Sequence, residues 1–283
     1  WENLNFPTLD LHELGNPFTE EVKTAINQMP SDKAPGPDGF TGAFFKSCWP
    51  IIKDDLMKVI SIFSSLHAEN FNWLNSANVV LLPKKEGAEA ITDFRPISLI
   101  QAIAKIVAKV MAMRLTPFMN ILVSRAQSAF IKSRCIHDNF MYVRNYARRL
   151  QRTNTPSLLL KLDIKKAFDS VRWEYLLDLL QRRGFPSRFR EWITALLRTS
   201  TSRVLLNGVP GNPIQHGQGL WQGDPVSPLL FVLAIDPLHH ILAKATDQGL
   251  PHPLRGQPIY ASLYVDDDAI FLAPTKDYIH FLA

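Results

Sequence analysis

The feature that most constrains the fold of this chain is a run of three aspartates set between two apolar segments near its C-terminal end. Residues 262–265 and 269–272 have the composition of short β-strands, and Asp266, Asp267 and Asp268 lie between them. Strands of this kind reverse direction in a tight hairpin, where a buried carboxylate is unfavourable unless a partner compensates for its charge. The run therefore predicts a β-hairpin with an acidic turn.

A second strand-like segment also carries an aspartate. Residues 157–164 form an apolar run interrupted only by Lys161 and Asp163, which is the pattern of a buried strand. Divalent cations held between converging strand ends would compensate for these carboxylates. Two carboxylate-bridged Mg²⁺ ions are the usual means of nucleotidyl transfer. Acidic pairs are also common in ordinary turns, so the chemistry must be identified from further motifs.

Helical periodicity accounts for most of the remaining chain. Apolar residues at helical spacing predict helices over residues 19–29, 51–66, 101–120, 138–151, 173–183, 187–198 and 227–245. Residues 78–83 predict a strand that enters a hairpin with Lys84 and Lys85 at its tip. Helices, a hairpin, more helices and a small sheet follow one another, and this order predicts an α+β fold.

Composition narrows the class of protein. The 283 residues suffice for one large domain or two small ones, and Cys48 and Cys135 fit neither a zinc site nor a disulfide framework. We expect no membrane association and no secretion, because no apolar run is long enough to span a bilayer and no signal segment begins the chain. We therefore expect an intracellular location, nuclear or cytoplasmic. The net charge of +5 suits nucleic acid as a partner, but also an ordinary basic protein.

Several motifs in a fixed order carry a resemblance to a known family. In chain order they occupy residues 33–39, 82–85, 94–99, 127–132, 134–139, 163–169, 222–231 and 264–267. Among them, Phe168 follows Asp163 by five positions, and an aromatic-x-Asp-Asp sequence begins at Tyr264. Together these motifs resemble those of reverse transcriptases. Residues 127–139 narrow the resemblance to non-LTR (LINE-type) retrotransposon polymerases, particularly those of plants, with group II intron maturases ranked second.

The resemblance implies the fingers and palm of a right-hand polymerase, in which a small antiparallel palm sheet packs on helices. Residues 1–75 would form an N-terminal helical extension leading into the fingers, and residues 76–283 the fingers and palm, cut off before the thumb. Asp163, Asp266 and Asp267 would be the catalytic residues and would bind two Mg²⁺ ions, with Mn²⁺ able to replace them.

The resemblance also implies which residues bind substrates. The nucleotide would contact Lys84, Lys85, Arg95, Phe168, Gln222 and Gly223, and the template or primer would contact Arg134, Arg148, Arg149 and Tyr264. Arginine suits phosphate because its fork binds two oxygens at once, and Phe168 would be the steric gate that selects dNTPs by excluding a 2′-hydroxyl. Plainer interpretations remain: a solvated hairpin tip for the lysines, a core position for Phe168, and a solvated helix face for the arginines.

These assignments predict an RNA-directed DNA polymerase that adds dNTPs to a DNA primer on an RNA template. Because the resemblance implies a thumb that these residues do not include, we expect low or absent activity from the isolated chain. A catalytically inactive remnant and a group II intron maturase-like reverse transcriptase are alternatives. Two other palm enzymes fit less well. An RNA-dependent RNA polymerase must admit the 2′-hydroxyl that Phe168 would exclude, and a nucleotidyl cyclase lacks the fingers hairpin.

Five residues depart from the pattern of the family. Gln218 stands where an arginine is expected near Gln222. Trp221 stands where a basic residue is common, Ser133 where glycine is usual, Val265 where alanine is usual and Asp268 where a small apolar residue is usual. We expect Ser133 to strain its turn if a positive φ is required there. Since Tyr264 lies two positions before Asp266, we expect Asp266 and Asp267 to be the functional pair. Asp268 would then be a slightly harmful substitution that raises the proton affinity of its neighbours.

Overall fold

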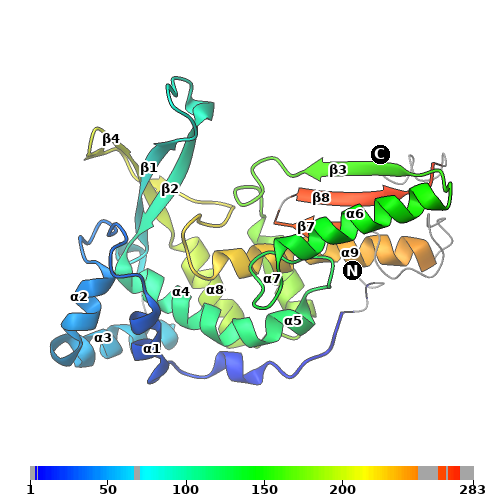
Figure 1. The fold of residues 1–283 in the computed structure, drawn as a ribbon. Helices are drawn as coiled ribbons and strands as arrows, with labels where there is room; N and C mark the ends of the chain where they lie inside the picture. The colour runs from blue at the N-terminus through cyan, green and yellow to red at the C-terminus, as the bar shows by residue number, and fades with distance from the viewer. Residues whose placement is uncertain (1–3, 5, 67–70, 248–260, 266, 275–283) are drawn as a thin grey trace. The chain divides into compact units, whose positions relative to one another are not determined.

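The structure is a computed structural model that describes residues 4, 6–66, 71–247, 261–265 and 267–274 (Figure 1). The chain divides into two compact units, each assembled from segments that are distant in the sequence. Unit 1 consists of residues 1–7, 116–167 and 229–283, and unit 2 consists of residues 8–115 and 168–228.

Unit 2 combines one sheet with several helices. Its helices are α1 (Glu21–Gln28), α2 (Gly42–Ser47), α3 (Trp49–Ser64), α4 (Ala102–Leu115), α7 (Trp173–Arg182) and α8 (Ser187–Arg198), with short 3-10 turns at His12–Gly15, Phe71–Trp73 and Ile91–Asp93. Its strands are β1 (Ser76–Pro83), β2 (Phe94–Ile100), β4 (Thr201–Leu206), β5 (Val209–Pro210) and β6 (Ile214–Gln215). The strand order is β2-β1-β4-β5, and β6 also pairs with β4. β1 and β2 are antiparallel, whereas β1 and β4 are parallel.

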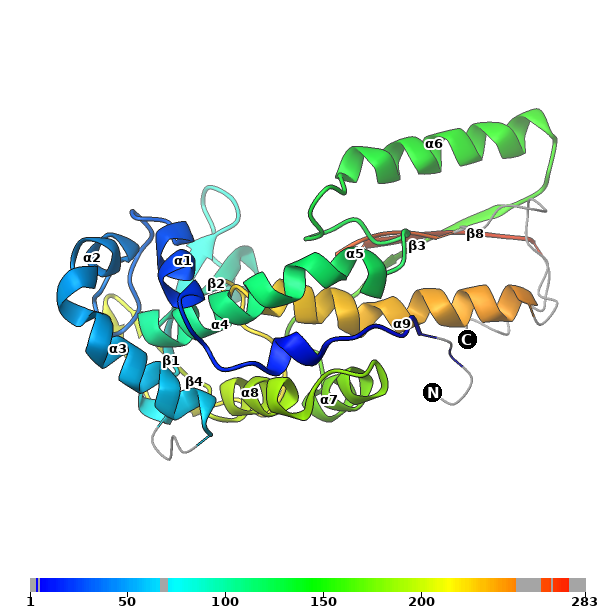
Figure 2. The ribbon, with the colours of Figure 1, turned by 90° about the horizontal axis from the view of Figure 1, so that it is seen from below.

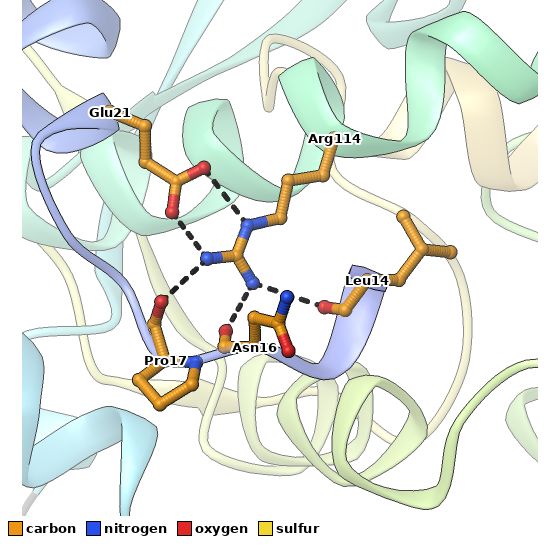
Figure 3. Close-up of polar contacts among 5 residues, drawn as sticks. All are labelled: Leu14, Asn16, Pro17, Glu21 and Arg114. Carbon is orange, nitrogen blue, oxygen red and sulfur yellow. Dashed lines mark hydrogen bonds and ion pairs between the residues drawn. The ribbon is translucent and has the colours of Figure 1, made fainter. Parts of the chain in front are cut away.

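Helix α4 lies at the centre of unit 2 and holds the N-terminal segment in place. Its residues Ile106, Val107, Val110 and Met111 are fully buried, as their helical spacing predicts. Near its C-terminal end, the Arg114 guanidinium binds the carboxylate of Glu21 and donates to the backbone carbonyls of Leu14, Asn16 and Pro17 (Figure 3). It also lies 4.8 Å from the ring centroid of Phe18. Residues 8–28 are therefore part of unit 2.

Unit 1 is built on a three-stranded antiparallel sheet of order β3-β8-β7. Its elements are β3 (Leu158–Asp163), β7 (Ala261–Tyr264), β8 (Asp267–Leu272), α5 (Met119–Leu122), α6 (Ile136–Arg152) and most of α9 (Ser227–Asp247), with a 3-10 turn at Thr116–Phe118. Figure 2 shows the sheet edge-on, between α6 and α9. Tyr146 and Leu150 of α6 pack against Phe271 of β8 in a buried cluster.

The predicted α+β fold is confirmed, and most predicted helices begin and end within a few residues of the observed ones. Helix α7 is followed by Gly184 with a φ of 77°, the left-handed conformation that commonly ends a helix. The helix predicted over residues 101–120 was wrong in its length. It ends at Leu115, because Pro117 follows and the residue before a proline disfavours helical geometry.

The buried strand predicted over residues 157–164 was also wrong in one respect. β3 exists, but among the described strands it lies at the edge of its sheet, and Leu158 and Leu159 are 44% and 56% exposed. The predicted division of the chain at residue 75 stays a prediction. The two compact units follow other boundaries and place residues 8–75 in the same unit as β1 and β2. Within the described ranges, no helix combines the length and the hydropathy needed to cross a bilayer.

Candidate functional site

The candidate acidic site lies at one end of the sheet in unit 1. Asp267 begins β8 and is directly opposite Asp163 on one neighbouring strand and Tyr264 on the other. Directly opposed residues of antiparallel strands point to the same face, with Cα atoms about 4.5–5.5 Å apart. Tyr264, Asp267 and Asp163 therefore form one row across the sheet. Asp266, the third predicted ligand, lies outside the described residues.

An ammonium group lies on the same face of the sheet as this row of carboxylates. Lys161 lies two positions before Asp163 and on the same face of β3, and its Nζ is 3.1 Å from Oδ1 of Asp267. The Lys161 and Asp267 side chains are 71% and 57% exposed, so their ion pair adds little stability and is easily exchanged. Two solvent-exposed carboxylates on one face suit a hard divalent cation such as Mg²⁺. No cluster of three or more metal-ligating side chains occurs in the part of the chain that the structure describes.

Asp268 lies on the opposite face of the sheet. It pairs with Leu162 and Leu263, and it is only 1% exposed. Neither carboxylate oxygen makes a hydrogen bond of normal geometry to the described residues. Burial raises the pKa of Asp268 to about 7, and the nearby amide of Ala269 opposes this rise only weakly. Asp268 is therefore a buried acid outside the row that contains Asp163 and Asp267.

The segment Ala126–Ser128 supports the acidic hairpin from one side. The Leu263 amide donates to the Ala126 carbonyl at 2.9 Å, and the Ser128 amide donates to the Leu263 carbonyl at 3.2 Å. The Asn139 side chain also donates to the Leu263 carbonyl, at 2.7 Å. Sequence reasoning used residues 127–139 only as a family motif and missed this role, because the contacts join segments far apart in the chain.

Arg134 uses its guanidinium inside unit 1. Its Nη1 donates to the carbonyls of Ser124 at 2.5 Å and Gln127 at 2.6 Å, and its Nη2 donates to the carbonyls of Asn120 and Val123, both at 3.0 Å. These four contacts give Arg134 a structural role, and its contact with nucleic acid stays a prediction.

Arg148 and Arg149 lie elsewhere in unit 1, on helix α6. Both arginines are exposed. They are therefore accessible to a polyanion.

Unit 2 brings together three of the predicted nucleotide-binding residues. The Leu220 amide donates to the Phe168 carbonyl at 2.9 Å, which places Phe168 beside the segment that leads to Gln222 and Gly223. Gly223 has a φ of 105°, and a Cβ there would lie 3.2 Å from the Ser98 carbonyl oxygen of β2. Only glycine combines this conformation with so close an approach of two backbones. The glycine therefore sets the position of the exposed Gln222 side chain relative to β2.

The predicted phosphate-binding cations of unit 2 differ in their surroundings. Lys84 donates to the Thr92 carbonyl at 2.8 Å, and Lys85 pairs with Asp93 at 2.9 Å and lowers the pKa of that carboxyl. Arg95 is exposed on β2, and its guanidinium has no hydrogen bond or ion pair with any residue that the structure describes. The Arg95 side chain is therefore available to a ligand, whereas Lys84 and Lys85 both have partners within unit 2.

Trp221 is anchored to the sheet of unit 2. Its Nε1 donates to Nε2 of His216 at 3.4 Å, and that ring nitrogen lies 3.0 Å from the Ser202 hydroxyl. Burial lowers the pKa of His216, which favours the neutral ring. Neither Trp221 nor His216 therefore supplies the positive charge that the family pattern has before Gln222.

The comparisons with known proteins that follow point to a single protein family. A family model described as "Reverse transcriptase (RNA-dependent DNA polymerase)" matches residues 82–283. The chain is 32% identical to the "Transposon TX1 uncharacterized 149 kDa protein" of Xenopus laevis, over 90% of this chain and 19% of that protein. It is 29% identical to the "Retrovirus-related Pol polyprotein from type-1 retrotransposable element R2" of Nasonia vitripennis, over 86% of this chain and 23% of that protein.

A more distant relative is the "RNA-directed DNA polymerase from mobile element jockey" of Drosophila melanogaster, 24% identical over 89% of this chain and 27% of that protein. The chain thus spans between about a fifth and about a quarter of the length of these relatives. Among solved structures, a chain of a "Partial Cas6-RT-Cas1--Cas2 complex" has a TM-score of 0.47 and 17% identity, over 93% of this chain and 38% of that chain.

Proposed function

Because the chain belongs to the reverse transcriptase family and its relatives are non-LTR retrotransposon polymerases, we propose that it catalyses RNA-templated DNA synthesis. Members of this family act on a template, a primer and nucleotides, and they use divalent metal ions. The observation that carries the proposal is the register of the sheet in unit 1, which sets Asp267 directly opposite Asp163 on an open face.

Asp163 and Asp267, with Asp266, would hold two Mg²⁺ ions, and these would supply activation of a primer 3′-hydroxyl and charge neutralisation at the phosphates. The exposed ion pair of Lys161 with Asp267 would compete with a cation for that carboxylate. Arg95 has a guanidinium available for a pair of phosphate oxygens. Phe168, whose backbone carbonyl accepts from the Leu220 amide, would exclude a ribose 2′-hydroxyl.

The partners proposed for this chemistry are an RNA template, a DNA primer and dNTPs. Arg148 and Arg149 on α6 are proposed to contact the nucleic-acid backbone, because both side chains are exposed and positively charged. We also propose an intracellular site of action, nuclear or cytoplasmic, and an origin in a plant-like element.

Primer extension on an RNA template with Mg²⁺ tests this function. Wild-type protein should incorporate dNTPs, and Asp163→Asn should reduce incorporation at least 1,000-fold because it removes a proposed metal ligand. Asp178→Asn is a matched control, since Asp178 forms an exposed ion pair with Arg182 on α7 and should be replaceable without loss. Equal activity of Asp163→Asn and wild type would rule out the proposed site, and equal use of rNTPs by wild type would rule out the steric gate.

A catalytically inactive remnant is a second candidate, favoured by three departures within unit 1. Asp268 is buried without compensation, and Ser133 and Val265 both have positive φ values, of 74° and 59°. If wild type incorporates no dNTP while the triple variant Ser133→Gly, Val265→Ala, Asp268→Ala does, the remnant is the better description.

A further inference from the structure

The turn of the acidic hairpin contains a residue in an unfavourable conformation. Val265 lies between Tyr264, the last residue of β7, and Asp266, and it has a φ of 59°. A β-branched side chain is rarely found in this left-handed region, because its Cβ substituents crowd the backbone. Such a conformation persists only where the surrounding structure imposes it.

The side chain of Gln127 contacts both backbone polar groups of Val265. Its Oε1 accepts a hydrogen bond from the Val265 amide at 3.3 Å, and its Nε2 donates to the Val265 carbonyl at 3.4 Å. Oε1 also accepts from the Ala129 amide at 2.9 Å. Two amide donors face one end of the carboxamide and a carbonyl faces the other, so this pattern fits one orientation of the side chain. Gln127 is 1% exposed, so water does not compete for these bonds.

The backbone of Gln127 is held independently of its side chain. Its neighbours Ala126 and Ser128 both hydrogen-bond to Leu263, and its own carbonyl accepts from Arg134 at 2.6 Å. Replacing only the carboxamide would therefore leave these contacts in place. The effect of the carboxamide on Val265 can be measured separately from the effect of the frame.

The hairpin needs a specific contact such as the one from Gln127, because its sequence does not specify the pairing register of β8. Shifting a strand by one residue moves every side chain to the other face. Residues 269–272 are apolar at every position, so either face of β8 could pack against the core. Asp267 and Asp268 are adjacent and chemically alike, so a shift of one residue would exchange the exposed acid and the buried acid.

We propose that Gln127 is a positioning residue: its carboxamide holds Val265 in the left-handed conformation and thereby keeps Asp267, rather than Asp268, opposite Asp163. It acts through Val265 and touches neither substrate nor metal. The effect on metal binding rests on the proposed function, whereas the effect on the turn does not.

A double-mutant cycle tests the proposal on the whole 283-residue chain. Gln127→Met removes the carboxamide at nearly constant volume, and Val265→Gly permits a positive φ without strain. In the wild-type background, Gln127→Met should speed hydrogen exchange of the residue 265 amide at least 10-fold by NMR and weaken Mn²⁺ binding, followed by EPR, about 10-fold. In the Val265→Gly background, we expect both changes to shrink below about 3-fold, because glycine no longer needs to be held. If Gln127→Met does not fold, Gln127→Glu, which keeps the acceptor oxygen, takes its place in the same cycle.

A matched control separates positioning from general stability. Asn75 of unit 2 is also a 1% exposed amide, and its Nδ2 donates to the Leu196 carbonyl at 2.6 Å and the Thr199 hydroxyl at 2.8 Å. Asn75→Leu should lower the melting temperature as much as Gln127→Met but leave residue 265 exchange and Mn²⁺ affinity unchanged.

Two results would overturn the proposal: unchanged exchange at residue 265 in Gln127→Met, or an equal effect in both Val265 backgrounds. If wild type binds no Mn²⁺ while the exchange results are as expected, the proposed function fails and the positioning role stands.

Discussion

Replacing Asp268 by asparagine should stabilise the metal-free protein at neutral and alkaline pH relative to acid pH. Asp268 is 1% exposed, and neither of its oxygens makes a hydrogen bond of normal geometry to a described residue. Burial disfavours the charged form and raises the pKa of this carboxyl from an ordinary value of 3.8 to about 7. Asparagine has nearly the same shape and no charge, so it removes the ionisation and keeps the packing.

The magnitude follows from the two pKa values. The folded state holds this proton more tightly than the unfolded state, so the free energy of unfolding falls as the pH rises from about 4 through 7. The full difference between 3.8 and about 7 corresponds to about 4 kcal/mol, reached once both states are ionised. Between pH 5 and pH 8, the stability of Asp268→Asn relative to wild type should therefore increase by about 2.5 kcal/mol.

Urea unfolding followed by circular dichroism, in EDTA at pH 5, 6, 7 and 8, measures this difference. Comparing Asp268→Asn with wild type cancels the contribution of the other titrating groups, because both proteins contain them. Asp178→Asn, at an exposed ion pair of α7, should show a difference below about 0.5 kcal/mol at every pH. Parallel stability profiles of Asp268→Asn and wild type from pH 5 to pH 8 would refute the reasoning, because they would mean that Asp268 is not a buried, titrating acid.

Three further changes have expected outcomes. Ser133→Gly should raise the free energy of unfolding by about 1 kcal/mol in urea, because Ser133 has a φ of 74°; no gain would mean that its turn is unstrained. Lys161→Gln should tighten Mn²⁺ binding by no more than about 5-fold, measured by EPR, because an exposed ion pair of Asp267 is worth at most about 1 kcal/mol; weaker binding would mean that Lys161 assists the cation. Arg114→Met should destabilise the chain by about 3–5 kcal/mol in thermal unfolding, since it leaves Glu21 and three carbonyls without their donor, whereas Arg182→Met should change little.

Local patterns explain why most elements could be predicted from the sequence. Helix α8 was predicted over its observed residues, 187–198, because Phe189, Trp192 and Ile193 repeat at helical spacing and Pro186 precedes them. Ser133 was expected to strain its turn because glycine is usual at its position, and its positive φ agrees. These inferences depend only on residues that are near one another in the chain.

Contacts between distant residues could not be predicted in this way. Gln127 and Val265 are 138 positions apart, and nothing in either segment indicates that the side chain of one holds the backbone of the other. Trp221 was recognised as a departure, but its bond to His216 depends on how the two residues lie against β4. The exposure of β3 was missed because an apolar composition does not distinguish an edge strand from a central one.

The three aspartates of the hairpin lead to a last prediction. With Asp267 and Asp268 adjacent, one carboxylate is buried in either register of β8, so the unfavourable burial does not favour one register over the other. Asp268→Ala removes that cost from the observed register only, because a shifted strand would still bury Asp267. The substitution should therefore make the carboxamide of Gln127 less necessary. We expect Asp268→Ala to restore Mn²⁺ affinity and slow residue 265 exchange in the Gln127→Met variant, measured by EPR and NMR. If the double variant binds Mn²⁺ no better than Gln127→Met alone, competition between two registers is not what Gln127 resolves.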